Sequence, residues 1–150
     1  MHNQGKVLLG VNRSSFRVVT SLRTLATILA GLVVFQKSDG TYNAAGDGTP
    51  IGLSFGADLS DIKSTCLCKL GLEVPIRLED GFTPAIGAQV HVLKSTGKAV
   101  AEDTVGTTTV GLNATYMPAW VGANTAVLSG VPEDGSAEVR VALIDLAGGV

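Results

Sequence analysis

The sequence predicts an all-β protein, a small sandwich or barrel of short strands with an extended N-terminal arm. Glycine accounts for 19 of the 150 residues, above the usual share of about 7%, and this excess indicates many turns. Short apolar clusters rich in Val, Ile and Thr follow one another closely, and Gly, Pro and Asp separate them. Many short strands with such turns are typical of sandwiches and barrels. The length suits one domain with its own core.

The first segment, residues 1–35, differs from the rest of the chain. It contains no Asp, Glu or Pro. Segments 7–9 and 16–19 are β-type clusters. From 21 to 34, apolar residues recur at helical spacing, so a short helix competes with a strand there. We therefore expect an extended arm, with a helix as the alternative near its end. All its formal charges are positive, and they lie at Lys6, Arg13, Arg17 and Arg23.

A turn-rich stretch, residues 36–50, is expected to be an exposed loop between this arm and a β domain of residues 51–150. Within the domain, Gly71 is expected to separate two strands, and the Thr-Gly-Lys sequence around Gly97 predicts a hairpin turn. A Pro-Glu-Asp-Gly turn precedes the last strand. Strands are predicted at 51–55, 64–70, 73–78, 89–93, 99–101, 107–110, 112–120, 125–128 and 137–146.

Charge and composition exclude several classes of function. The formal net charge is −2, which argues against a general nucleic-acid binder. The apolar run 25–35 is far shorter than the roughly 20 residues of a membrane span. It resembles a signal sequence in part, but it starts late and contains Thr27, so we expect it to be retained. Charged residues make up only 16%, against about 25% in ordinary domains, which predicts that a partner covers part of the surface.

One catalytic pattern is present. Residues 52–56 match G-x-S-x-G, the nucleophile elbow of α/β-hydrolases. These enzymes carry their catalytic serine, acid and histidine in that order along the chain. Ser54, Asp80 and His91 would match this order. The elbow needs alternating strands and helices around it, however, and this chain shows mostly strands. We therefore interpret Ser54 as the end of a strand, and we expect no enzymatic activity, no cofactor and no metal site.

The two cysteines, Cys66 and Cys68, form a C-x-C pair. Positions i and i+2 of a strand share a face about 7 Å apart, which is too far for an easy disulfide. A zinc site would need two further ligands. We expect reduced thiols on a core face of a protein made in the cytoplasm.

The densest aromatic patch covers residues 116–120 and includes Tyr116 and Trp120. Large aromatic side chains are common both in cores and in binding hot spots. From the sequence, both interpretations stay open.

Five segments follow one another in the body of the chain: 48–53 (GTPIGL), 71–78 (GLEVPIRL), 82–92 (FTPAIGAQVHV), 96–99 (TGKA) and 137–144 (AEVRVALI). With these segments the chain, from about residue 48 to 150, resembles the small decoration, or cement, proteins of tailed-bacteriophage capsids. The resemblance implies a β-rich protein that binds the outside of the expanded head. It also implies a dimer or trimer that clamps neighbouring major capsid subunits, without catalytic residues.

We therefore expect a structural virion protein on the capsid exterior, whose partners are the major capsid protein and further copies of itself. No nucleic acid and no membrane are expected as partners. The alternatives are a tail or fibre module, a secreted surface-binding β module and, last, a serine hydrolase. Apolar arm residues are expected to dock by burial or strand addition, and arginines to match an acidic surface. The predicted interface residues are Val7, Leu8, Leu9, Arg13, Phe16, Arg17, Val18, Val19, Arg23, Tyr116 and Trp120.

Overall fold

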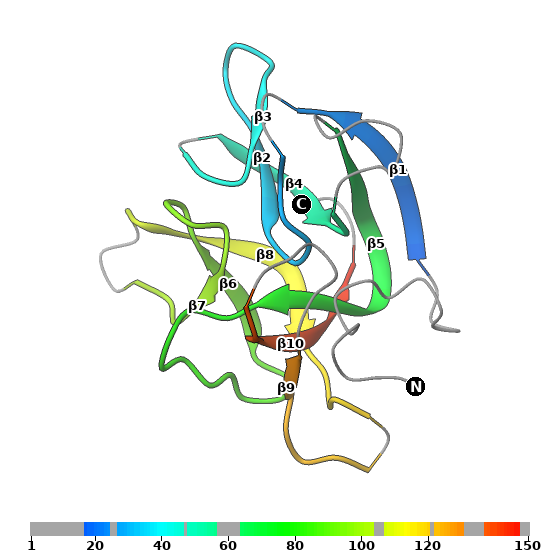
Figure 1. Cartoon of the computed structure of the whole chain (residues 1–150). Coiled ribbons are helices and arrows are strands. Elements are labelled where there is room, and N and C mark those ends of the chain that lie inside the picture. Colours follow the sequence, from blue (N-terminus) through cyan, green and yellow to red (C-terminus); the bar gives the residue numbers. More distant parts are fainter. Residues whose placement is uncertain are drawn as a thin grey trace.

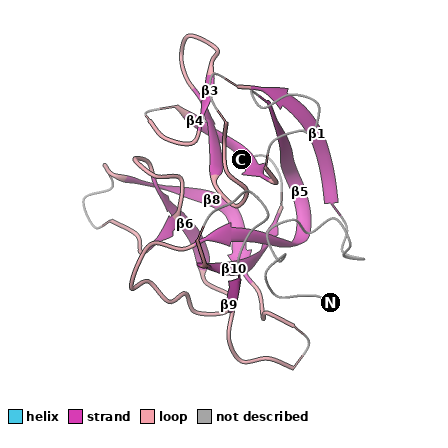
Figure 2. Cartoon of the chain, viewed as in Figure 1, coloured by secondary structure: helices cyan, strands magenta, loops and turns pink. Residues whose placement is uncertain are grey.

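The fold consists of ten β-strands, and the described residues contain no helix (Figures 1 and 2). The computed structural model describes residues 17–24, 27–46, 48–56, 64–103, 107–120, 122–130 and 137–147. The all-β prediction is confirmed. The strands are β1 (Arg17–Arg23), β2 (Val33–Gln36), β3 (Tyr42–Asn43), β4 (Thr49–Ser54), β5 (Ser64–Arg77), β6 (Gln89–Leu93), β7 (Ala99–Val100), β8 (Thr109–Tyr116), β9 (Val127–Gly130) and β10 (Val139–Leu146).

The strands form one antiparallel sheet that curls into a half-barrel. Its order is β3-β2-β4-β5-β10-β8-β6-β7, with β1 added beside β5 and β9 beside β10. Curling brings the two ends of this order together. The amide of Val33 in β2 donates to the carbonyl of Gly97, in the turn between β6 and β7, at 3.0 Å. Gly97 has φ +77°, and a Cβ there would lie 2.5 Å from the carbonyl oxygen of Ala44. The predicted hairpin turn is confirmed and lies against the far end of the sheet.

The helix considered for residues 21–34 is wrong, because β1 ends at Arg23 and β2 begins at Val33. Most residues of the helical spacing lie before β2: Leu22 is in β1, and Leu29 packs against the second cluster from the segment between the two strands. Val33 packs in the main core, whereas its neighbour Val34 packs in a second cluster on the other face. Apolar residues at consecutive positions therefore fit strand alternation when both faces are buried. Residues 33–35 of the predicted arm thus belong to the body of the sheet.

The expected break at Gly71 is also wrong, because β5 runs without interruption through 14 residues. It bends strongly along its length (Figure 1). A bulge marks the bend: Ile144 pairs with Val74, but Leu146 pairs with Gly71. Within the bulge Glu73 has φ +54°, a left-handed conformation that is uncommon for residues other than glycine. The bend lets one strand pair with β1 and β4 in its first half and with β10 in its second.

The remaining predicted strands agree with the structure apart from their boundaries. The segments 107–110 and 112–120 are one strand, β8, which runs through Gly111. The predicted loop 36–50 contains the short strand β3, which pairs with β2, and the first residues of β4. These differences merge two predicted strands into one, add the short strand β3 and shift the ends of others, without changing the order of the elements.

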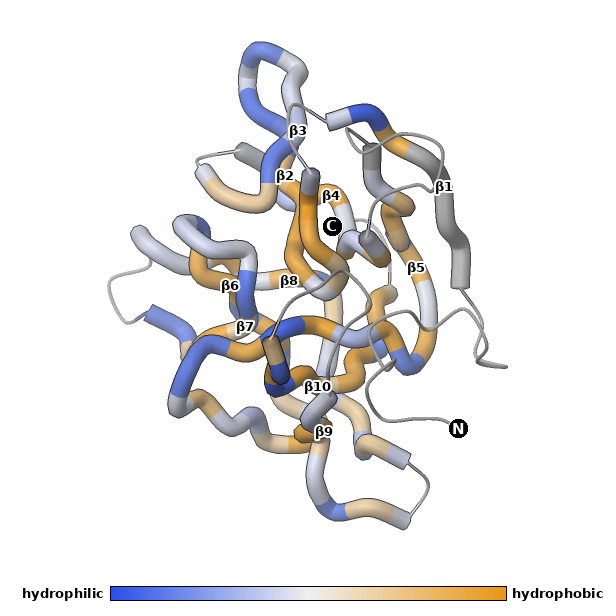
Figure 3. Tube along the Cα trace, viewed as in Figure 1, coloured by the Kyte–Doolittle hydropathy of each residue, from blue (hydrophilic) through white to orange (hydrophobic). Residues whose placement is uncertain are grey.

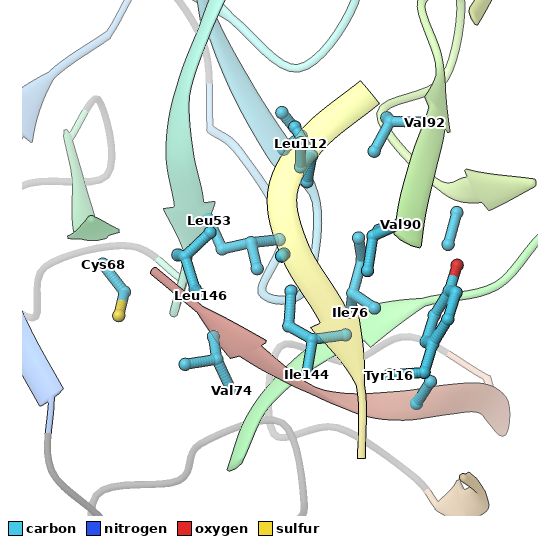
Figure 4. Packing of buried hydrophobic residues seen from close by; sticks show 14 of the residues in the cluster. Leu53, Cys68, Val74, Ile76, Val90, Val92, Leu112, Tyr116, Ile144 and Leu146 are labelled. Atoms are coloured by element: carbon cyan, nitrogen blue, oxygen red, sulfur yellow. The ribbon is translucent and has the colours of Figure 1, made fainter. Parts of the chain in front are cut away.

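The main core fills the concave side of the half-barrel (Figure 4). Apolar stretches of β2, β4, β5, β8 and β10 supply it (Figure 3). Ile76 and Ile144 are completely buried there. The second cluster comprises Ile28, Leu32, Val34 and Leu67, with Leu22 of β1 packed against it.

Candidate functional site

β1 carries most of the predicted interface residues that the structure describes. It pairs with β5 over its whole length, from Arg17 opposite Gly71 to Arg23 opposite Ser64. Within the described part of the chain, β5 is its one pairing partner. The second edge of β1 therefore presents backbone amides and carbonyls that no described strand takes up.

This edge carries few of the features that usually protect edge strands; the pairing of β1 with β5 has one irregularity, between Val18 and Val19, where Val18 stands opposite Leu70 and Val19 opposite Cys68. Native proteins block such edges with Pro, bulges, charges or very short strands. β1 has seven residues, and the five between Arg17 and Arg23 include no charged residue, Pro or Gly. The arginines stand at its two ends, and the Arg23 side chain is exposed. Such an edge is suited to accept an extended segment by backbone pairing.

The other arm residues of the predicted interface are not placed. Val7, Leu8, Leu9, Arg13 and Phe16 lie outside the described residues. For Val18 and Val19 the structure gives the backbone pairing, with Leu70 and Cys68 opposite them.

Tyr116 is a core residue, so its assignment to an interface is wrong. Its side chain is 3% exposed and belongs to the main cluster. The Phe82 ring packs against it at a centroid distance of 6.2 Å. The Tyr116 hydroxyl has no hydrogen-bond partner among the described residues, and burial raises the pKa of this phenol above its ordinary value. A buried residue at the end of β8 cannot contact a partner without unfolding.

Tyr116→Phe is expected to stabilise the protein by about 1 kcal/mol at neutral pH, because it removes a buried hydroxyl that lacks a partner. The raised pKa of Tyr116 adds a pH dependence. Above the ordinary tyrosine pKa of about 10, the unfolded chain releases a proton that the folded protein keeps, so wild-type stability falls as pH rises. The variant should lose less stability there. Urea unfolding at about pH 7 and about pH 11 measures both effects; a destabilised variant would contradict the assignment.

Trp120 has the opposite environment, although it is only four residues away. Its side chain is 57% exposed, the highest value among the large apolar residues of the described chain. The loop after β8 turns sharply, because the Ala123 amide donates to the Trp120 carbonyl at 3.0 Å. The patch therefore divides into one core residue and one surface residue, and the interface role of Trp120 stays a prediction.

Three further exposed apolar side chains were missed by the sequence reasoning, and Leu70, at 36% exposed, is one of them. Leu72 is 42% exposed and Ile86 is 41% exposed. Leu72 and Ile86 lie in segments whose sequence predicts a buried strand or a turn. The stretch around Ile86, residues 81–93, contains no charged residue, whereas Leu72 lies within β5 between Lys69 and Glu73, where no sequence signal marks it.

No family model and no curated protein matches this chain.

The G-x-S-x-G pattern has a structural role. Ser54 ends β4 and is completely buried. Its hydroxyl is hydrogen-bonded to that of Thr65, and it accepts from the Gly56 amide at 3.0 Å. β5, β10 and β8 separate β4 from β6, the strand of His91, and His91 Nε2 lies 3.7 Å from a carboxylate oxygen of Glu102. The serine thus fixes the end of β4 through buried hydrogen bonds.

Cys66 and Cys68 adjoin the main core as predicted. Cys68 is buried, Cys66 packs against the same cluster, and neither forms a disulfide. In the part of the chain that is described, no three His, Cys, Asp or Glu side chains gather to hold a metal ion. These described residues also form no helix that is long and apolar enough to cross a membrane.

Proposed function

We propose that this chain is a structural virion protein that binds the outer surface of a bacteriophage capsid and stabilises contacts between major capsid subunits. The observation that carries the proposal is the second edge of β1, with which no described strand pairs. An extended segment of a capsid subunit would add to the sheet beside β1, and its backbone groups would pair with those of the edge. The resemblance of residues 48–150 to capsid decoration proteins supports the same function.

The charge of β1 selects the partner. Arg17 and Arg23 stand at the two ends of the strand, so an added segment is favoured when acidic residues lie at both of its ends. Cross-strand pairs of opposite charge stabilise a sheet, and like charges destabilise it. The partner is therefore an acidic surface. Because the centre of β1 carries no charge, no like-charge repulsion acts there against backbone pairing with the added segment.

Modest single contacts are sufficient for this function. A capsid presents many identical sites in a fixed array, so weak contacts of one copy add up when the copy touches two subunits. The low share of charged residues, 16%, suits a surface that is largely covered on the particle. The function requires no cofactor.

Quantitative mass spectrometry of purified heads of the phage that encodes the chain tests the proposal. We expect the chain to co-purify with full heads at a copy number near that of the major capsid protein. A few copies per particle would instead indicate a tail or fibre module. Its absence from particles would overturn the virion function and favour a surface-binding module, for which the mature N-terminus would be determined next.

A further inference from the structure

Two leucines of β5 are exposed beside β1. Leu70 is 36% exposed and Leu72 is 42% exposed, whereas Gly71 between them is buried. This alternation places both leucines on one face of the strand, because residues i and i+2 of a strand point to the same side. We call Leu70 and Leu72 the leucine pair.

The register of the sheet shows which face this is. Gly71 stands opposite Leu146 of β10, and Leu146 belongs to the main core. Opposite residues share a face and consecutive residues alternate, so the leucine pair lies on the other face of the sheet, that of the second cluster. Leu67 of β5 belongs to this cluster, and Leu22 of β1 packs against it. The leucine pair therefore continues an apolar face that is buried elsewhere.

Two irregularities of β5 set the direction of the leucine pair. At the first, the pairing with β1 passes from Cys68 directly to Leu70 and leaves out Lys69. The second lies at Glu73, whose φ is +54°. An extra residue shifts the alternation of the residues that follow it, and without the first shift Leu70 would share the core face of Cys68. Bulges that redirect side chains in this way are common next to functional sites.

The leucine pair is continuous with the second edge of β1. Val18 stands opposite Leu70, and Arg17 opposite Gly71, so the pair flanks the first residues of β1 at the bend of β5 (Figure 1). Residues in register across neighbouring strands share a face. A residue of an added segment that stands opposite Val18 therefore extends the row that Leu70 begins. No described residue of β1 stands opposite Leu72, and the added segment can cover it by continuing past Arg17.

The charges around the leucine pair indicate its partner. Lys69 is exposed and Arg17 begins β1, while Glu73 on the other side is half-buried. A second copy of the chain would bring the same positive charges to this surface, and like charges in contact oppose association. An acidic segment of another protein is attracted by these charges and covers the leucines at the same time.

We propose that the leucine pair and the second edge of β1 form one docking surface, and that the capsid segment added there presents a large apolar side chain beside its acidic end. This inference rests on the proposed function, which supplies the segment, and gives that segment a sequence pattern. The positions opposite Arg17 and Arg23 are acidic, and the position opposite Val18 is apolar. A shift of the segment by one residue would turn the apolar side chain to the opposite face.

Titration of undecorated heads with wild-type protein and with the double variant Leu70→Ser, Leu72→Ser tests the inference. We expect the variant to reach half-saturation at about tenfold higher concentration, because it loses the apolar contact and keeps the backbone pairing. Leu70→Met with Leu72→Met should bind within about twofold of wild type, since it keeps the apolar area. Ile86→Ser is the matched control, because Ile86 is 41% exposed but lies in the loop between β5 and β6; its binding should be unchanged.

Two synthetic peptides test the sequence pattern on the wild-type protein without heads. Both match the 7 residues of β1 in length and have glutamate at each end. The first carries leucine at its second and sixth positions, the other carries leucine at its third and fifth, and threonine fills the rest. Only the first peptide places a leucine opposite Val18, whichever direction it takes, because strand side chains alternate between faces. With peptide at about millimolar concentration, NMR should show the methyl signals of the leucine pair shifting with the first peptide and not with the other.

The outcomes separate the inference from the proposed function. Equal binding of wild type and the serine variant to heads would overturn the inference and leave the proposed function intact. Equal shifts with both peptides would also overturn it, as would contacts of the leucine pair with residues 1–16 or with a second copy in the free protein. If heads take up no wild-type protein, the proposed function fails, and the peptide comparison alone decides whether the leucine pair belongs to the docking surface of β1.

Discussion

Replacing Ile144 by alanine is expected to lower the free energy of unfolding by about 3 kcal/mol. Ile144 is completely buried, and in the sheet it stands opposite Tyr116 of β8 and Val74 of β5. The change removes three carbon atoms from the centre of the main core and leaves a cavity that the three strands cannot close. Domains of this size are stable by only about 5–15 kcal/mol, so this is a large fraction of the total. Urea unfolding followed by fluorescence gives the difference.

Ile86→Ala is the matched control for Ile144→Ala. It removes the same atoms from a side chain that is 41% exposed, so its effect on stability should stay within about 0.5 kcal/mol. Because the two variants lose the same atoms, a difference between their losses of stability reflects the burial of Ile144. Equal losses for the two variants would show that Ile86 is covered in the protein or that Ile144 is not, and the position of the core would have to be revised.

The sequence was most informative about elements whose pattern comes from one buried face. The hairpin of β6 and β7 was predicted because Val90 and Val92 alternate with more polar neighbours, and a glycine follows at the turn. Both valines are buried in the structure. Period-two alternation and turn chemistry are local properties, so a single sequence suffices to predict them.

Elements that depend on distant partners were harder to predict. The break expected at Gly71 is absent, because β5 gains pairing partners on both sides of this residue. Its direction changes instead at Glu73, whose left-handed backbone has no sequence signal. The helical spacing of residues 21–34 misled for a similar reason, because distant parts of the sheet bury its residues: Leu22 and Leu29 pack against the second cluster, and Val33 lies in the main core.

The candidate site shows a similar limit. Tyr116 and Trp120 belong to one aromatic patch in the sequence, yet one is 3% and the other 57% exposed. The end of β8 lies between them, and a sequence indicates element ends poorly. The role of Ser54 also depends on a distant residue, because its hydroxyl is hydrogen-bonded to Thr65 on the neighbouring strand.

Reversing both arginines of β1 is expected to weaken binding to heads by about 30-fold or more. Arg17→Glu with Arg23→Glu replaces two attractions to an acidic surface by two repulsions, and a change of about 2 kcal/mol or more follows from the penalty for like charges at an interface. Reversal of charge is a better test than removal of the arm, because Arg17–Arg23 is a strand of the sheet and deletions into it would expose the edge of β5. Occupancy on heads, titrated at low salt, measures the effect.

Lys94→Glu with Lys98→Glu is the matched control, because it changes net charge equally in and beside the turn between β6 and β7, away from β1 (Figure 1). The Lys98 ammonium lies 3.9 Å from a Glu79 carboxylate oxygen. Both residues are half-buried, and at this distance the loss of the ion pair should cost little stability. If this control weakened binding as much as the β1 variant, only overall charge would matter and the β1 edge would not be the docking surface. Increasing salt should weaken wild-type binding and reduce the difference between wild type and the β1 variant, since screening removes the charge term. The pairing of backbone groups along β1 should persist at high salt, which separates strand addition from a purely electrostatic attachment.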